Sequence, residues 1–305
     1  MSFHSLTLDD HRNDERGRIK KTPFEHQFAA FEAMNACFEF DKDQGKGGLL
    51  VLPTGAGKTF TTVKWVCDNV VTRNIRVLWL ANSYYLLDQA FREIYEYARW
   101  IPEPRQTLNI RLVSSNPSHD SPSSILLTDD VVVMTTPTAI KNLNSTAEDR
   151  SGNPVTTNFR KWIEEGNKSG LFVVLDEAHH APAHGCRHLL IGTDEAAPGI
   201  RRIVKRANLL GLTATPTYSD ESRKGWLGKI FESGEAGIIF KADKAKLTAE
   251  GILARPNYIQ RPTGNELYVP DDLYNRLVRE HKDLPEDIIE KLANDHRRND
   301  AIVQE

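Results

Sequence analysis

The segment with the most distinct chemistry is residues 52–59, which read LPTGAGKT. Glycines permit positive φ angles, so the backbone N–H groups of such a loop can turn toward one anion. We expect the loop to bind a polyphosphate through Thr54, Gly55, Ala56, Gly57, Lys58 and Thr59. Lys58 would reach the β and γ phosphates, and the Thr59 hydroxyl suits Mg²⁺. The strict pattern has glycine where this chain has Leu52, and the alternative is a glycine-rich turn with an incidental lysine.

Two adjacent carboxylates, Asp176 and Glu177, directly follow the apolar run 171–175. An acid at the carboxyl end of a parallel strand lies on the sheet edge where ligands bind in open α/β proteins. We expect Asp176 to hold Mg²⁺ and Glu177 to orient and deprotonate the attacking water, close to Lys58. These three residues are the expected catalytic group. The alternative, a solvated acidic cap after a strand, is disfavoured by the phosphate loop.

Three histidines, His180, His184 and His188, are spaced four residues apart after the acidic pair. On one helix their imidazoles would share a face and could bind a metal. Pro182 and Gly185 interrupt the helical pattern, so we favour a polar segment that flanks the acidic motif.

A third polar motif, Thr213-Ala214-Thr215, follows the apolar run 209–212. Short hydroxyl side chains at a strand end can hydrogen-bond to a neighbouring acidic motif. Such contacts would link the state of a bound nucleotide to movement of the next element. Alone the signal is weak, because threonine-rich turns after strands are common.

The elements that must position these motifs alternate between strands and helices. The apolar runs read as strands at residues 49–52, 77–80, 110–113, 131–135, 171–175 and 209–212. Near-continuous apolar runs are typical of strands buried on both faces of a parallel sheet. Amphipathic stretches at 59–71 and 83–98 lie between them, the second with Ser83 as a candidate N-cap. The alternation predicts an α/β fold with a doubly wound, mostly parallel sheet.

The remaining segments read as loops and a helical C-terminal extension. Residues 114–124 and 144–158 are rich in small polar residues and predict surface loops. Residues 242–251 form a helix candidate that ends at Gly251, and residues 271–301 are helical by composition but broken at Pro285. This tail is too short for a second complete α/β domain.

Composition excludes several classes of protein. The 305 residues carry 39 Lys and Arg against 42 Asp and Glu, a formal charge of −3, so any nucleic-acid binding must use a local patch. Three cysteines are too few for a disulfide scaffold and favour a reducing compartment. Because the apolar runs are too short for a membrane span and the N-terminus has no signal peptide, we expect a cytoplasmic protein.

The order of these motifs resembles the first RecA-like motor domain of a superfamily 2 helicase of the DEAD/DEAH-like group. Residues 53–59, 176–179 and 213–215 are similar to its motifs I, II and III. The resemblance implies that ATP and Mg²⁺ are the cofactors. It also implies that Gln27, in a Q-like motif, reads adenine, and that His179, Thr213 and Thr215 couple ATP to movement.

Looser matches to motifs Ia and Ib imply contacts to the nucleic-acid backbone at Asn82, Gln89 and Thr136. Relatives usually have a basic residue or proline where this chain has Asn82-Ser83, which weakens the strand-contact assignment.

The C-terminal segment 231–256 resembles the restriction-subunit (ResIII-like) and repair helicases, and residues 295–302 resemble the helix that opens their second motor domain. The resemblance implies an N-terminal extension (1–21), a RecA-like ATP-binding domain (22–240), and a connector with the start of a truncated second motor domain (241–305). Because the arginine finger of such proteins comes from the second domain, we expect this chain to bind ATP but hydrolyse it slowly.

The implied function is an ATP-dependent helicase or translocase acting on nucleic acid, with DNA favoured, no membrane partner, and partner subunits of a larger complex. One alternative is an RNA helicase. Another is a nucleotide-gated DNA-binding subunit of a restriction, defence or repair complex that does not unwind, which an intact Glu177 disfavours. A small-molecule phosphotransferase is disfavoured by the combination of motifs II and III.

Overall fold

A computed structural model describes residues 2–13, 20–145, 147–148, 154–192, 197–216, 225–255, 290–291, 293–296 and 299–300. All six strands expected from the apolar runs are present. The main sheet contains β1 (Phe3–Thr7), β2 (Gly47–Val51), β3 (Arg76–Ala81), β4 (Thr107–Val113), β5 (Val131–Thr135), β8 (Leu171–Leu175), β9 (Asn208–Thr213) and β10 (Ile238–Lys241). β2, β5, β8 and β9 are buried along their whole length, which explains their apolar sequences.

The strand order across the sheet is β1-β4-β5-β3-β8-β9-β2-β10. β1 runs antiparallel to β4, and the other neighbouring pairs are parallel. After β2 the chain crosses to β3, continues to β4 farther out, comes back to β5 between β4 and β3, and then places β8 and β9 between β3 and β2. The sheet is therefore doubly wound and mostly parallel, as the sequence predicts. This path makes β8, β9 and β2 direct neighbours.

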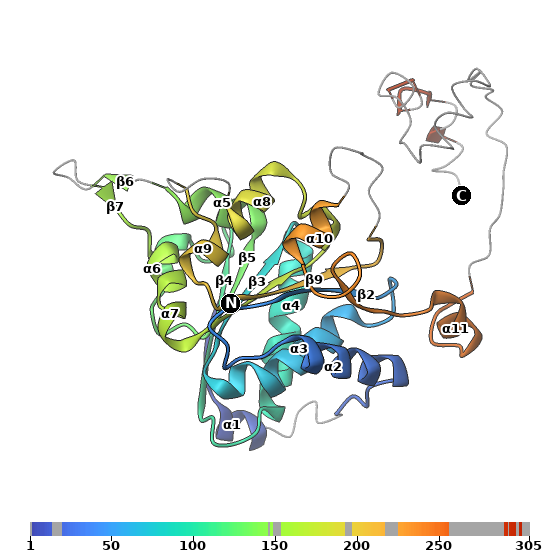
Figure 1. Cartoon of the computed structure of the whole chain (residues 1–305), viewed down its shortest axis with the longest axis horizontal. Coiled ribbons are helices and arrows are strands. Elements are labelled where there is room, and N and C mark those ends of the chain that lie inside the picture. The colour runs from blue at the N-terminus through green and yellow to red at the C-terminus, as the bar shows by residue number, and fades with distance from the viewer. Residues whose placement is uncertain are drawn as a thin grey trace.

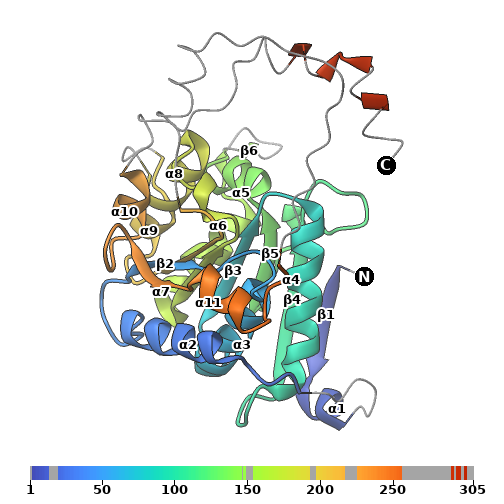
Figure 2. The same ribbon diagram turned by 90° about the vertical axis from the view of Figure 1, so that its right-hand side faces the viewer.

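Helices cover both faces of the sheet (Figure 1, Figure 2). One face carries α2 (Glu25–Cys37), α3 (Lys58–Asn69) and α4 (Tyr84–Tyr97), and the other carries α5 (Thr136–Leu143), α6 (Asn158–Glu164), α8 (His184–Ile191) and α9 (Ile200–Ile203). Each layer has its own apolar core, built around Trp65 and Phe172 on the first face and around Trp162 and Phe231 on the second. Shorter helices complete the fold: α1 (Leu8–Asn13), α7 (Gly166–Ser169), α10 (Trp226–Ile230), α11 (Lys244–Ala249) and the 3₁₀ turns η1 (Val71–Arg73), η2 (Ala98–Trp100), η3 (Pro122–Ser124) and η4 (Ala178–His180).

The expected helix boundaries have identifiable local causes. Ser83 caps α4 as expected, because its hydroxyl accepts a hydrogen bond from the backbone N–H of Leu86 at 3.3 Å. Asp243 caps α11 by accepting from the N–H groups of Ala245 and Lys246. Gly251, at φ +74°, adopts the left-handed conformation just beyond that helix.

The two edge strands, β1 and β10, are not predicted from the sequence. β1 is short and polar, so it carries no run of apolar residues. It is held by Arg111 of β4, whose guanidinium lies over the Phe3 ring at 4.3 Å and pairs with the buried Asp129 at 2.6 Å. β10 lies at the other edge, next to β2, with a register irregularity after Ile238. Residues 3–13 and 238–253 thus pack on the same sheet or its cores.

Several expectations concern segments that are described in part or not at all. The expected loop 114–124 consists of turns and η3, and the segment 144–158 contains a two-stranded ribbon, β6 (Ala147–Glu148) with β7 (Pro154–Val155). Most of the helical stretch expected over 271–301 lies outside the described residues, and the domain boundaries at residues 21 and 240 stay predictions. Within the described parts, none of the helices combines the length and the apolar character that crossing a membrane requires.

Candidate active site

The phosphate loop connects β2 to the first turn of α3. Gly55 and Gly57 have φ angles of +86° and +80°, which L-residues with side chains rarely adopt. α3 begins at Lys58, so its unpaired first-turn N–H groups point out of the loop where an anion would bind. Within the described chain the Lys58 amine has no hydrogen bond or ion pair. The loop therefore presents an unpaired cation and a helix N-terminus at the carboxyl edge of the sheet.

The start of α2 braces this loop from one side. The Gln27 amide donates to the carbonyl oxygen of Ala56 at 3.2 Å and accepts from the N–H of Phe24 at 3.0 Å. The His26 ring Nε2 is also 3.0 Å from the Ala56 oxygen. A Cβ atom on Gly57 would lie 2.6 Å from the Gln27 amide nitrogen, so a larger residue would displace Gln27 and would also be strained at φ +80°. Gln27 is thus a structural neighbour of the phosphate loop, and its reading of adenine stays a prediction.

The acidic motif sits at the end of β8, two strands from the phosphate loop. Asp176 is 3% exposed, and its carboxylate accepts the N–H of Glu177 at 2.9 Å. Glu177 has a left-handed backbone, with φ +51° and ψ +52°. Such a conformation is uncommon for a residue other than glycine, and it often marks a functional turn. It turns the Glu177 side chain toward His179, whose Nδ1 is 3.2 Å from Glu177 Oε2.

Thr213, at the end of β9, lies between the acidic motif and the phosphate loop. Its hydroxyl donates to the carbonyl oxygen of Thr215 at 3.1 Å and accepts from the Thr215 N–H at 3.1 Å. The hydroxyl oxygen is also 3.2 Å from His179 Nδ1. Because the hydroxyl proton is used by Thr215, His179 must carry its proton on Nδ1 to bond both Thr213 and Glu177. The structure therefore brings the expected coupling residues into one hydrogen-bonded chain with Glu177.

The charge of Lys58, in the phosphate loop, affects the ionisation of Asp176 and His179 in the acidic motif. Burial, and then the charge of Glu177, raise the pKa of Asp176 to about 6, while the Glu177 N–H and the Lys58 charge act in the opposite direction. Burial, and then the charges of His180 and Lys58, lower the pKa of His179 against an upward pull from Glu177. Lys58 is therefore close enough to both residues for its charge to affect their ionisation. A buried carboxylate held ionised at neutral pH is a ready ligand for a cation.

The raised pKa of Asp176 makes a prediction about stability. The unfolded carboxyl loses its proton near the ordinary value of 3.8, whereas the folded one keeps it to about pH 6. The folded state binds more protons in that interval, so this residue lowers stability as pH rises from about 4 to 6. We expect Asp176→Asn to stabilise the nucleotide-free protein above pH 6 by on the order of 1–3 kcal/mol.

Urea unfolding of the wild type and the variant, without Mg²⁺ and nucleotide, measures the difference. The gap in unfolding free energy should be small below pH 4 and reach its full size above pH 6. A gap that does not change with pH would contradict the raised pKa.

The three residues expected to contact nucleic acid differ in their exposure. Asn82 is exposed directly after β3. Gln89 is exposed on α4, but its amide nitrogen is 3.5 Å from the Thr59 hydroxyl, beside the phosphate loop. Thr136 is 4% exposed, and its hydroxyl donates to the carbonyl oxygen of Ala81 at 3.4 Å. The Thr136 side chain is thus turned inward, and the nucleic-acid roles of all three residues stay predictions.

The histidines after the acidic pair separate into two pairs. The His179 and His180 rings lie 4.2 Å apart, and the His184 and His188 rings stack at 4.5 Å on α8. η4 ends before α8 begins, so His180 is not on the same helix as the other two. Among the described residues no group of three or more His, Cys, Asp or Glu side chains could hold a metal ion.

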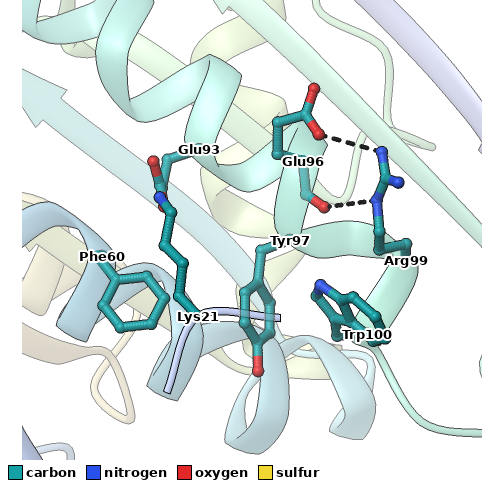
Figure 3. Close-up of a pocket in the computed structure, with 7 residues that line it drawn as sticks. All are labelled: Lys21, Phe60, Glu93, Glu96, Tyr97, Arg99 and Trp100. Carbon is teal, nitrogen blue, oxygen red and sulfur yellow. Dashed lines mark hydrogen bonds and ion pairs between the residues drawn. The ribbon is translucent and has the colours of Figure 1, made fainter. Parts of the chain in front are cut away.

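The structure also shows a contact that the sequence does not predict, between Lys21 and the helix α4, which we call the lysine clip. A cavity of about 140 Å³ is lined by α3, α4 and η2, and Lys21 lies across it (Figure 3). The Lys21 side chain runs between Phe60 and Tyr97 to Glu93, with Nζ 2.7 Å from Glu93 Oε1. The clip fastens the segment that leads into α2 to the outer face of α4. Its members come from distant segments, so no local pattern could reveal it.

A second missed contact comes from the segment after α11. Leu253 is 8% exposed, and its Cδ2 lies 3.4 Å from the position that a Cβ on Gly55 would take. The sequence predicts only a connector here. The packing places an apolar side chain from the C-terminal part of the fold directly on the phosphate loop.

Comparison with known proteins adds a family assignment by sequence. The profile of the family described as "Type III restriction enzyme, res subunit" (ResIII) matches residues 20–218. That stretch includes every motif described above. No curated protein matches the chain.

Solved structures with similar folds include several helicases and a restriction enzyme. The UvsW helicase of bacteriophage T4 is 16% identical, with a TM-score of 0.43 over 73% of this chain and 64% of that chain. A nuclease-deletion mutant of the Type ISP restriction-modification enzyme LlaGI, in complex with a DNA substrate mimic, is 23% identical, with a TM-score of 0.39 over 76% of this chain and 21% of that chain. A hypothetical ATP-dependent RNA helicase from Sulfolobus tokodaii is 16% identical, with a TM-score of 0.45 over 75% of this chain and 55% of that chain. The chain thus spans between about a fifth and two thirds of the length of these proteins.

Proposed function

The chain belongs to the family of type III restriction enzyme res subunits, and from this membership we propose that it is an ATP-dependent helicase or translocase acting on nucleic acid, with DNA favoured. Its main sheet and the helices that cover it form the first RecA-like motor domain of a ResIII-type helicase. DNA is favoured because the family is named for restriction enzymes, whose substrate is DNA. The assignment of residues 241–305 to a connector and the start of a second motor domain is part of the proposal.

The observation that carries the proposal is the convergence of three motifs on adjacent strands. β2 leads into the phosphate loop, β9 ends at Thr213, and β8 ends just before Asp176, in the order β8-β9-β2. The carboxyl ends of neighbouring parallel strands meet at one edge, where open α/β proteins bind ligands. This arrangement supports binding of a nucleoside triphosphate between residues that are more than a hundred positions apart in the sequence.

The residues present fit ATP and Mg²⁺. The left-handed glycines and the start of α3 form a concave set of N–H donors suited to phosphate oxygens. Thr59 and Asp176 offer the oxygen ligands that Mg²⁺ prefers. Asp176 in particular is buried beside another carboxylate, and a divalent cation there would remove the cost of ionising it. Mg²⁺ bound with the triphosphate neutralises the charge that develops during phosphoryl transfer.

Lys58, Glu177 and His179 then have separate roles in the reaction. Lys58 binds and stabilises the negative charge on the transferred phosphoryl group. Glu177 orients the attacking water and accepts its proton on a carboxylate oxygen. His179 holds the Glu177 carboxylate in place through Nδ1–H and connects it to Thr213 on β9. A change at the γ-phosphate can therefore be passed through His179 to Thr213 and Thr215.

ATP turnover of the full-length protein, measured with and without double-stranded DNA, tests the proposal. We expect DNA to stimulate turnover, and we expect RNA of the same length to stimulate it less. Stimulation by RNA alone would point to an RNA helicase. ATP-dependent DNA binding without any turnover would overturn the motor proposal in favour of a nucleotide-gated binding subunit.

A further inference from the structure

Two tyrosines stand exposed at the carboxyl edge of the sheet. Tyr84 and Tyr85 are the first two residues of α4, directly after the cap Ser83 and one residue beyond the exposed Asn82. Tyr84 is 42% exposed and Tyr85 is 76% exposed. Large aromatic side chains normally bury most of their surface, so a ring exposed to this degree at a functional edge calls for a reason.

The backbone that carries these rings is held firmly. The Tyr84 hydroxyl is 2.8 Å from the Ser115 hydroxyl, and the Tyr84 ring meets His119 edge-on at 5.8 Å. His119 in turn contacts Ser114 through Nδ1 at 2.8 Å and Asp88 through Nε2 at 3.3 Å. These contacts hold the Tyr84 side chain in place at the start of α4.

Tyr85 differs from Tyr84, because its side chain has no partner among the described residues. Within the described residues it has no hydrogen bond and no ring contact, so both its ring and its hydroxyl are free. A rigid element therefore presents a flat apolar surface to solvent. Few rotatable bonds separate that ring from the helix, so ordering it against a ligand would cost little conformational entropy.

The charges around the tyrosines indicate what this surface would bind. The neighbours of Tyr85 on the same face of α4 are Asp88, Gln89 and Arg92, so that face carries one cation and one carboxylate. Affinity for a phosphate backbone comes from several cations, so with one cation balanced by one carboxylate the main feature of this face is the exposed ring. Nucleic-acid bases have a π-face that stacks on aromatic side chains whatever the sequence. In a duplex those faces are already stacked on one another, so an exposed ring is open mainly to unpaired bases.

We propose that Tyr85, set in place by the braced Tyr84, is a stacking platform for an unpaired base of single-stranded nucleic acid. The platform rests on the proposed function and deepens it by naming the form of the substrate. It would engage a base directly, whereas the contacts expected at Asn82, Gln89 and Thr136 are to the backbone. The strand would lie across the start of α4, on the same edge as the phosphate loop.

The experiment measures binding of the full chain to three fluorescein-labelled probes by anisotropy. The probes are a single-stranded oligothymidylate, an abasic oligomer of the same length, and a blunt duplex. We expect Tyr85→Ala to weaken binding to oligothymidylate by about 5- to 100-fold, the range for losing one base–aromatic stack. Binding to the abasic oligomer, which keeps the phosphates but has no bases, should not change. Tyr85→Phe, which keeps the ring, should bind like the wild type.

Leu127→Ala is the matched control, because Leu127 is 50% exposed but precedes β5 at the opposite edge of the sheet. Neither alanine variant should alter the melting temperature, since both side chains are mainly in solvent. Unchanged oligothymidylate binding in Tyr85→Ala, or an equal loss on the abasic oligomer, would overturn the platform while leaving the helicase proposal intact. If the wild type binds none of the three probes, both proposals are wrong.

Discussion

Lys58→Ala is expected to weaken ATP binding by about 100-fold. Lys58 is the first residue of α3. Its side-chain amine has no partner within the described chain, so its full charge is available to the phosphates. Hydrogen bonds to charged groups contribute about 1.5–3 kcal/mol each, and the upper value corresponds to about 150-fold in affinity. The charge of Lys58 also lowers the pKa of Asp176. The variant should therefore raise that pKa further and bind Mg²⁺ less well at pH 6–7.

Isothermal titration with ATP, ADP and adenosine measures the effect. Affinity for ATP and ADP should fall, while any affinity for adenosine stays the same, because adenosine has no phosphate for Lys58 to contact. Lys246→Ala is the control, since Lys246 is 58% exposed on α11 and takes part in weak surface ion pairs. Unchanged ADP affinity in Lys58→Ala would show that residues 52–59 are not a phosphate loop.

Glu177→Gln is expected to leave ATP binding intact and to lower nucleic-acid-stimulated turnover by about 10²- to 10⁴-fold. That range is the usual contribution of a positioned general base. The glutamine oxygen can still accept the His179 Nδ1–H hydrogen bond, and the left-handed backbone at this position is retained. The variant thus removes the proton acceptor while keeping the local geometry.

Single-turnover hydrolysis in the full-length protein, with saturating ATP and DNA, is the measurement. Glu165→Gln is the control, because Glu165 forms a surface ion pair with Lys168 away from the site. Turnover that survives in Glu177→Gln would mean that another group deprotonates the water. A variant that loses ATP affinity as well would place Glu177 in binding rather than in proton transfer.

The main motifs could be predicted from the sequence because each depends on residues that are close together in the chain. Buried parallel strands must be apolar on both faces, so β2, β5, β8 and β9 appear as short apolar runs. The glycines of the phosphate loop and the cap at Ser83 satisfy backbone requirements within a few residues. The family resemblance then supplied the roles, which no spacing alone could give.

The features that escaped prediction depend on packing between distant segments. β1 is polar and stays on the sheet because Arg111, an unexpected charge in a strand, is neutralised by Asp129 and Asp120. Gln89 lies near Thr59 because of how α4 packs against α3. The sequence of either helix alone does not set the orientation of one helix relative to the other. The inward turn of Thr136 depends on the position of β3, whose Ala81 carbonyl it meets. Such contacts require the tertiary structure, because each partner is chosen by geometry rather than by local pattern.

The contact between Leu253 and Gly55 has a mechanical consequence. Leu253 follows α11 by four residues, and its Cδ2 lies 3.4 Å from where a Cβ on Gly55 would be. A displacement of α11 would therefore act on Gly55 through Leu253. Movement in this part of the fold would reach the phosphate loop directly, without passing through the other strands of the sheet.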